Sequence, residues 1–199
     1  MAEQRSPIAM ATPTAVLAVG ALCVGFWALL TGMVSPAAIP VIAAWALTVG
    51  TVVFICGVLE MVRGDILLGS TCLILAGLIG MGAGMSFNAI VAQPQEAWAA
   101  GLAQSGWVWV AVGVIVFALL RVYGKVSWSL FLFMLLLGVI LELLAYGLIV
   151  GVPLGTGTMV VTGWLLLVFA AYCIYAGTVF ITNTVYGAPK LSIGGPLFK

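Results

Sequence analysis

The chain has 199 residues, of which 65% are hydrophobic and only 6% are charged. A water-soluble domain carries roughly a quarter of its residues as charged side chains, so this composition excludes the soluble globular class. We therefore predict an integral membrane protein, and its few polar groups inside the apolar segments become the main evidence about its function.

Six apolar segments are long enough to cross a bilayer, because a helix needs about 20 residues to span ~30 Å of hydrocarbon. The spans are predicted at residues 13–34, 37–62, 66–92, 105–121, 127–151 and 158–182. Short breaks with Pro, Gly or charged residues separate them. The predicted fold class is all-α: a polytopic membrane protein with six transmembrane helices, forming a single domain over residues 1–199.

The basic residues predict the orientation of the chain. With six spans both termini share one side, and every Lys and Arg falls there: Arg5, Arg63, Arg121, Lys125, Lys190 and Lys199. The opposite loops, near residues 35–36, 93–104 and 152–157, contain neither. Because Lys and Arg favour the cytoplasmic side, we predict cytoplasmic N- and C-termini (N-in, C-in) in a multi-pass protein of the cell membrane.

Several chemical signatures are missing from the sequence. It has no histidine, and its four cysteines (Cys23, Cys56, Cys72 and Cys173) form no C-x-x-C pair. Such dispersed cysteines are expected to be free, buried thiols. No phosphate-binding loop, nucleophile elbow or basic patch for nucleic acid is present. We therefore expect a protein that is not an enzyme, with no metal, no cofactor and no nucleic-acid partner.

Small residues mark the third span, where Gly77, Gly80 and Gly84 share one helix face. Small residues let helix backbones approach closely in lipid, so tight packing is one interpretation. Room for a solute beside a pore is the other, and the sequence does not separate them.

Glu142 is the only acidic residue deep within a predicted span. Placing a carboxylate there costs about 2.5–3.5 kcal/mol on insertion scales. One interpretation assigns it to proton coupling or to the polar lining of a path. The other makes it a neutral packing residue, satisfied across helices or near Tyr146 one turn away.

The sixth span carries a narrow polar arc formed by Trp164, Tyr175, Thr178 and Thr182, followed by Asn183. Hydroxyl and amide groups on one helix face are suited to holding a small polar solute without a fixed charge. The alternative is that the threonines bond to their own helix and the tyrosine only packs.

Other aromatic residues lie near the predicted span ends. Trp107, Trp109, Trp128 and Tyr186 are expected to be interfacial anchors. Because no Lys or Arg lies inside the bilayer, a carboxylate would find no positive partner on its way through. It would cross as the neutral acid, or be held briefly by hydroxyls, amides and backbone N–H groups.

One stretch resembles a known family. Residues 57–64, G-V-L-E-M-V-R-G, continue to Thr71 and Gly77. They are similar to the G-x-L-E-x-x-x-G…G-x-T…G pattern of the acetate uptake transporter family, which includes the succinate–acetate permeases of YaaH/SatP type. The sixth span, Asn183 and the L-S-I-G run that ends at Gly194 also fit the family's spacing. The opening signature matches only at Leu17, so the chain resembles a divergent member.

This resemblance implies a six-helix bundle with a path inside each protomer, assembled as a homo-oligomer that is a hexamer in the family. It implies transport of acetate and related short-chain carboxylates, both monocarboxylates and succinate, in symport with a proton, and a narrow point at Gly20, Ala76 and Leu137. The candidate path residues are thus Thr71, Leu137, Glu142, Trp164, Tyr175, Thr178, Thr182 and Asn183. Glu60 and Arg63 are expected to brace the cytoplasmic end of the second span.

Two other functions stay open from the sequence. One is a channel for ammonia, ammonium or urea-like solutes, which the weak opening signature and Glu142 favour. The other is a membrane subunit that transports nothing and anchors a larger complex, which the Gly-rich faces and small loops fit equally well.

Overall fold

The computed structural model describes residues 10–198, which are folded almost entirely into helices. The elements are α1 (Thr12–Leu30), η1 (Pro36–Ala38), α2 (Ile39–Arg63), α3 (Ile66–Leu75), η2 (Ala76–Gly82), α4 (Ala83–Val91), η3 (Gln95–Ala97), α5 (Trp98–Val126), α6 (Trp128–Val150) and α7 (Gly157–Tyr186). Within this part of the chain, six helices are long and apolar enough to cross a membrane, with α3, η2 and α4 joined into one span. The predicted polytopic all-α fold is confirmed.

The fourth span differs most from its predicted bounds. It was expected at 105–121, whereas α5 runs from Trp98 to Val126. The predicted loop at 93–104 is therefore wrong for residues 98–104. Alanine and leucine dominate this stretch, and both are strong helix formers. At the other end, Gly124 lies within the helix and Ser127 adopts an extended backbone that separates α5 from α6.

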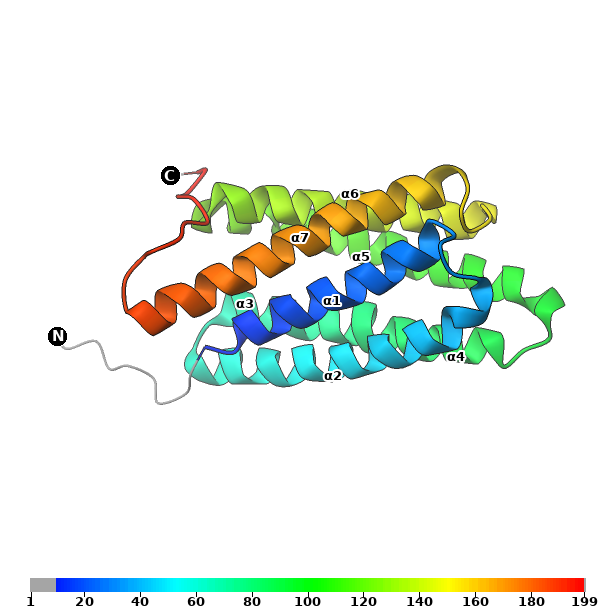
Figure 1. The fold of residues 1–199 in the computed structure, drawn as a ribbon, viewed down its shortest axis with the longest axis horizontal. Coiled ribbons are helices and arrows are strands. Elements are labelled where there is room, and N and C mark those ends of the chain that lie inside the picture. Colours follow the sequence, from blue (N-terminus) through cyan, green and yellow to red (C-terminus); the bar gives the residue numbers. More distant parts are fainter. Residues whose placement is uncertain (1–9, 199) are drawn as a thin grey trace.

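The six spans form a closed ring in chain order. Contacts join α1 to α2, α2 to α3 and α4, α4 to α5, α5 to α6, α6 to α7, and α7 back to α1. Figure 1 shows the long helices side by side, with the start of α1 and the segment after α7 at the same end of the bundle. We call this the terminal end, and the other the far end.

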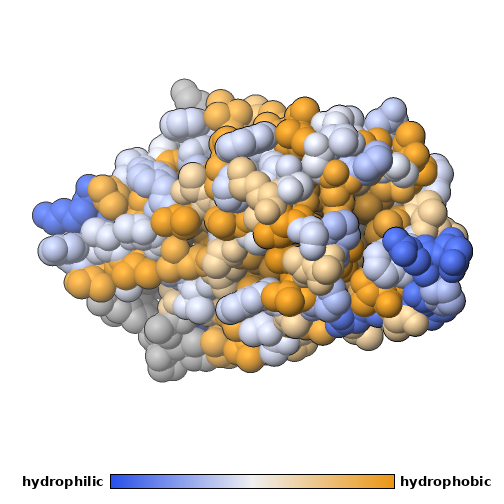
Figure 2. All heavy atoms as spheres, turned by 45° about the vertical axis from the view of Figure 1, so that its right-hand side comes forward, coloured by the Kyte–Doolittle hydropathy of each residue, from blue (hydrophilic) through white to orange (hydrophobic). Residues whose placement is uncertain are grey.

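The surface matches a lipid environment. In Figure 2 apolar residues cover much of the middle of the visible face, and strongly hydrophilic residues gather toward its two ends. The exposed side chains include many large apolar ones, such as Val41, Trp45, Ile55 and Val168. In water such a surface would be unfavourable, whereas in a bilayer it contacts acyl chains.

The third span is interrupted by a π-helical turn, η2, which lies against α2. Gly80 packs on Gly50 of α2 so closely that a Cβ atom on Gly50 would lie 2.6 Å from the backbone nitrogen of Met81. The small residues of this span therefore provide close helix packing within the chain. Wide turns of this kind often occur at functional sites, and Ala76 and Ile79 of η2 line the cavity described next.

Candidate functional site

The spans enclose a cavity of about 400 Å³, within the range of about 300–1,000 Å³ that small-molecule sites occupy. Its wall includes Val19 of α1, Val53 of α2, Leu75 of α3, Trp109 of α5, Leu137 of α6 and Phe169 of α7. On α1 the lining extends from Thr12 to Phe26, about 21 Å at 1.5 Å per residue. The cavity thus runs along the bundle axis over about two thirds of the ~30 Å hydrocarbon layer.

Polar lining groups are concentrated at the terminal end of the cavity. Thr12 begins α1, Asp65 caps α3, and Thr71 lies less than two turns further along. Tyr123 is near the end of α5, and the Tyr172 hydroxyl is 2.7 Å from Ser129 Oγ at the start of α6. A polar solute that enters from this end therefore first meets hydroxyl groups and the carboxyl group of Asp65.

The hydroxyl of Thr71 is the most informative of these groups. Thr71 is buried, at 6% exposure, and its Oγ1 has no hydrogen-bond partner among the described residues. The Tyr123 hydroxyl lies nearby without a well-formed hydrogen bond to it. Buried hydroxyls are nearly always paired with protein or water. An unpartnered one beside a cavity is a candidate hydrogen-bond partner for a solute oxygen.

The inner part of the cavity is apolar. Toward the far end its wall consists of groups such as Phe26, Leu144 and Leu166. No Lys or Arg lines the cavity within the described residues. Beyond it, Leu30 and Met159 are buried without lining it, so the far end is closed by packed side chains.

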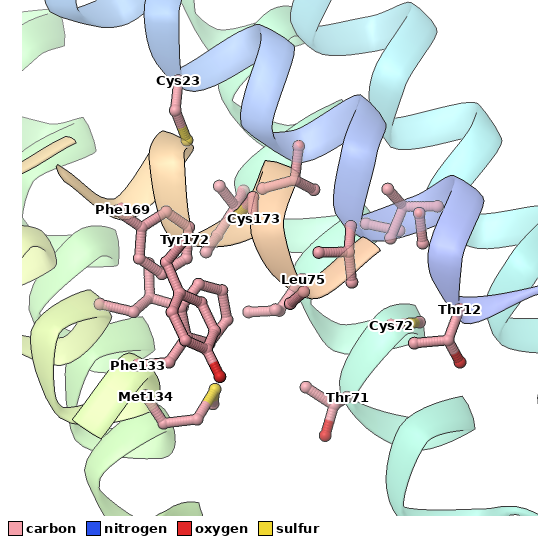
Figure 3. A pocket seen from close by; sticks show the side chains of 18 of the residues that line it. Thr12, Cys23, Thr71, Cys72, Leu75, Phe133, Met134, Phe169, Tyr172 and Cys173 are labelled. Carbon is pink, nitrogen blue, oxygen red and sulfur yellow. The ribbon is translucent and has the colours of Figure 1, made fainter. Parts of the chain in front are cut away.

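Aromatic rings form the wall on the side of α6 and α7. The rings of Phe133 and Phe169 are stacked with centroids 4.1 Å apart, and Tyr172 lies 4.6 Å from Phe133. Figure 3 shows this cluster on one side of the cavity, with Thr71 and Thr12 on the other. Of the four free cysteines, Cys23, Cys72 and Cys173 line the cavity. In residues 10–198 no group of three or more His, Cys, Asp or Glu side chains could hold a metal ion.

Glu60 and Arg63 lie behind the terminal end of this wall. Glu60 is fully buried, and its Oε1 accepts hydrogen bonds from Ala11 N (2.7 Å), Thr12 N (2.8 Å) and Thr12 Oγ1 (2.7 Å). Its Oε2 accepts one from Arg63 Nη1 at 2.7 Å. The first N–H groups of a helix lack an intrahelical acceptor and form its positive end. Glu60 therefore caps α1 and ties its start to α2.

The predicted path residues separate into two groups. Thr71 and Leu137 line the cavity. Six others do not: Glu142, Trp164, Tyr175, Thr178, Thr182 and Asn183. The polar arc of α7 faces outward, so Trp164 is 50% exposed and Tyr175 is 44% exposed.

Four of these outward groups have identified neighbours within the chain. Thr178 Oγ1 donates to Ile174 O of its own helix at 2.8 Å. The Trp164 ring packs edge-on against Trp27, with centroids 5.6 Å apart. Tyr175 and Asn183 instead bond to the segment after α7. Tyr175, Thr178 and Asn183 thus form hydrogen bonds within the chain and need no solute.

Glu142 lies on the side of α6 that faces α5. Its carboxyl group occupies the space that the missing side chain of Gly113 leaves on α5, so that a Cβ atom there would overlap it. No hydrogen bond to this carboxyl group is seen among residues 10–198, and Glu142 is half-buried. The structure places it in the α5–α6 contact and not on the cavity wall.

Other cavity residues escaped the sequence analysis. Trp109, expected to be an interfacial anchor, is only 5% exposed and lines the cavity. Gly20, expected at a narrow point, packs against α7, where a Cβ atom would lie 2.9 Å from Cys173 Cβ. From α1, Val16 and Val19 reach the cavity instead. Ala76 does line it. Cavity-facing and lipid-facing positions are both apolar, so they can be told apart only when the rotation of each helix about its own axis is known.

Comparison with known proteins adds a fold likeness. No protein-family model matches the chain, and no curated protein matches it in sequence. A solved structure described as that of the bacterial acetate channel SatP matches with a TM-score of 0.73. The match covers 94% of this chain and 99% of that one, at 21% sequence identity. The chain has the fold of that channel. The family resemblance in the sequence is therefore confirmed as a likeness of fold.

Proposed function

We propose that the chain is a membrane channel or permease for acetate and related short-chain carboxylates, which pass through the cavity within one protomer. The observation that carries this proposal is the unpartnered Thr71 hydroxyl on the wall of an elongated cavity inside the ring of spans. The fold likeness to a bacterial acetate channel supports the class of solute.

The solute crosses the inner part of the cavity as the neutral acid. No Lys or Arg lines this part among the described residues, and burying an unpaired carboxylate in an apolar environment is very unfavourable. A protonated carboxyl group needs only hydrogen bonds, which Thr71 and the nearby hydroxyls offer at the terminal end. Each acid molecule then carries one proton, which makes net transport proton-coupled.

The terminal end is the cytoplasmic end of the bundle. The described basic side chains belong to its helix ends and to the segment after α7: Arg63, Arg121, Lys125 and Lys190. Positive charge near span ends favours the cytoplasmic side. The mouth of the cavity thus faces the cytoplasm, and passage to the outside requires the packed Leu30 and Met159 side chains to separate at the far end.

Copies of the chain associate through their outward faces into a homo-oligomer, which the family resemblance implies to be a hexamer. Trp164, Tyr175 and Thr178 are exposed on the outward face of α7 in a single protomer. Polar side chains at such positions are suited to contacts between helices in lipid. Mass spectrometry of the intact assembly from native membranes measures the number of copies and any foreign subunit.

A wall without Lys or Arg among the described residues also suits a neutral solute such as ammonia or urea, and this observation favours a second candidate function. Stopped-flow shrinkage and pH-dye assays on the same proteoliposomes compare acetate with urea and ammonium. Faster urea or ammonium flux than acetate flux would favour this second candidate.

The test of the leading proposal is uptake of labelled acetate into proteoliposomes. We expect uptake above that of empty liposomes, rising as the external pH falls because the fraction of neutral acid rises. Lactate and succinate serve as comparison solutes. No protein-dependent uptake of any of the three would contradict transport and favour the role of a membrane scaffold.

A further inference from the structure

The segment after α7 is attached to the outside of that helix. In residues 190–198, here called the strap, the N–H groups of Lys190 and Leu191 donate to Asn183 Oδ1 at 2.8 and 3.0 Å. Asn183 Nδ2 donates to Leu191 O at 2.8 Å, and the Tyr175 hydroxyl donates to Ser192 O at 2.7 Å. Tyr175 of the polar arc of α7 and Asn183, which follows the arc, therefore hold the start of the strap.

The other end of the strap is attached across the bundle. Leu197 N donates to Gly124 O at 2.7 Å, and Trp128 N donates to Gly195 O at 2.9 Å. The ring of Phe198 packs edge-on against Phe131, with centroids 5.7 Å apart. The strap therefore bridges the terminal end of the bundle, from α7 to the junction of α5 and α6.

Ile193 lies between these two attachments, and it is the one strap residue that lines the cavity. Its carbonyl oxygen accepts hydrogen bonds from Ser127 Oγ and Ser129 Oγ. Ser129 Oγ also pairs with the hydroxyl of Tyr172, another lining residue. This hydroxyl cluster fixes the backbone of Ile193 while its side chain contributes to the cavity mouth.

We propose that Ile193 is the cytoplasmic gate of the transport path, and that the strap opens the mouth by leaving its hydroxyl cluster. A single apolar side chain at a narrow mouth blocks a path by excluding water. The start of the strap is held by exposed hydrogen bonds, and segments held in this way open locally at low free-energy cost. This inference rests on the proposed function, because a gate has a physiological role only if a solute passes through the cavity.

The lining cysteine Cys72 provides a test that does not depend on transport. In a background with Cys23, Cys56 and Cys173 changed to Ala, a charged methanethiosulfonate reagent is added to the purified protein in nanodiscs, and modification of Cys72 is followed by mass. We expect slow modification of this parent. Ile193→Ala removes the gate side chain, and Asn183→Ala releases the start of the strap. Both should raise the modification rate at least fivefold.

Two matched variants control for nonspecific loosening. Leu191→Ala changes an exposed apolar strap residue that does not line the cavity. Thr184→Ala removes a hydroxyl that bonds only to Phe180 O of α7. Both should stay within twofold of the parent, and thermal unfolding midpoints verify that every variant is folded.

Acetate flux measured on the same variants separates the two proposals. Faster Cys72 modification together with faster flux supports both the gate and transport. If Cys72 is modified faster in the variants but neither they nor the parent show acetate flux, the opening of the mouth is supported and the proposed function is contradicted. Flux with an unchanged modification rate in folded Ile193→Ala overturns the gate. If Asn183→Ala fails to fold, Ile193→Ala alone decides.

Discussion

The two faces of α7 differ in polarity, and the difference is the opposite of what a water-filled path would require. The inward face carries Phe169, Cys173 and Ala176, which are at most 2% exposed and line the cavity. The outward face carries the polar arc, of which Trp164 is 50% exposed. The apolar face of this helix lines the cavity, and the polar face lies outside it.

The difference shows that polarity alone does not identify a path in a membrane helix. In lipid a threonine hydroxyl satisfies itself on the preceding turn of its own helix, as Thr178 does with Ile174 O. Tyr and Asn side chains instead bind a neighbouring segment, as Tyr175 and Asn183 do here. A path for a neutral acid needs only a few hydroxyls at its mouth.

The largest expected effect comes from filling the inward face. Ala176→Phe places a ring in the cavity and should reduce acetate flux in proteoliposomes by more than tenfold. Val168→Phe makes a similar enlargement on the outward face, where Val168 is 60% exposed, and should leave flux within twofold. Equal losses of acetate flux in the two variants, both folded, would contradict the assignment of the path to the inward face of α7.

A smaller effect is expected from the unpartnered hydroxyl. Thr71→Val removes Oγ1 and keeps the shape of the side chain. Because a neutral hydrogen bond contributes about 0.5–1.5 kcal/mol, acetate flux at limiting solute should fall by roughly two- to tenfold. Thr178→Val is the matched control on the outward face. A loss in Thr178→Val without one in Thr71→Val would assign the path to the outside of α7.

The smallest effect is expected at Glu142. Because its carboxyl group fits against Gly113 and not into the cavity, Glu142→Gln should change acetate flux by less than twofold. The dependence of flux on external pH, measured from acidic to neutral conditions, should keep its shape. A shifted pH profile would restore the proton-coupling role considered from the sequence.

The spans were predictable because long apolar segments have few alternatives in a bilayer. Their ends were less so: residues 98–104 lie beside Glu96 and Gln95, which suggested a loop, yet their alanines continue α5. The π-helical turn at η2 was not predicted: the sequence marked Gly80 for close packing, which occurs against Gly50 of α2, but close packing alone does not specify a wide turn.

The cavity was only partly predictable, for a different reason. Thr71 and Leu137 were found through the family resemblance, and both line the cavity. Trp109 and Val19 were not found, because cavity-facing and lipid-facing positions are both apolar in this protein. Ile193 lies outside every span, so no pattern within the helices could indicate its place in the wall.

The cap on α1 has a consequence for how the protein is made. The acceptor for the N–H groups of Ala11 and Thr12 is Glu60, supplied 48 residues after Thr12. During synthesis the amino-terminal helix therefore lacks its acceptor until nearly all of the next helix has left the ribosome. The first two membrane segments should thus mature as a hairpin. A nascent chain of which only the residues before Glu60 have emerged from the ribosome should hold its leading helix less firmly than one that has emerged beyond Arg63.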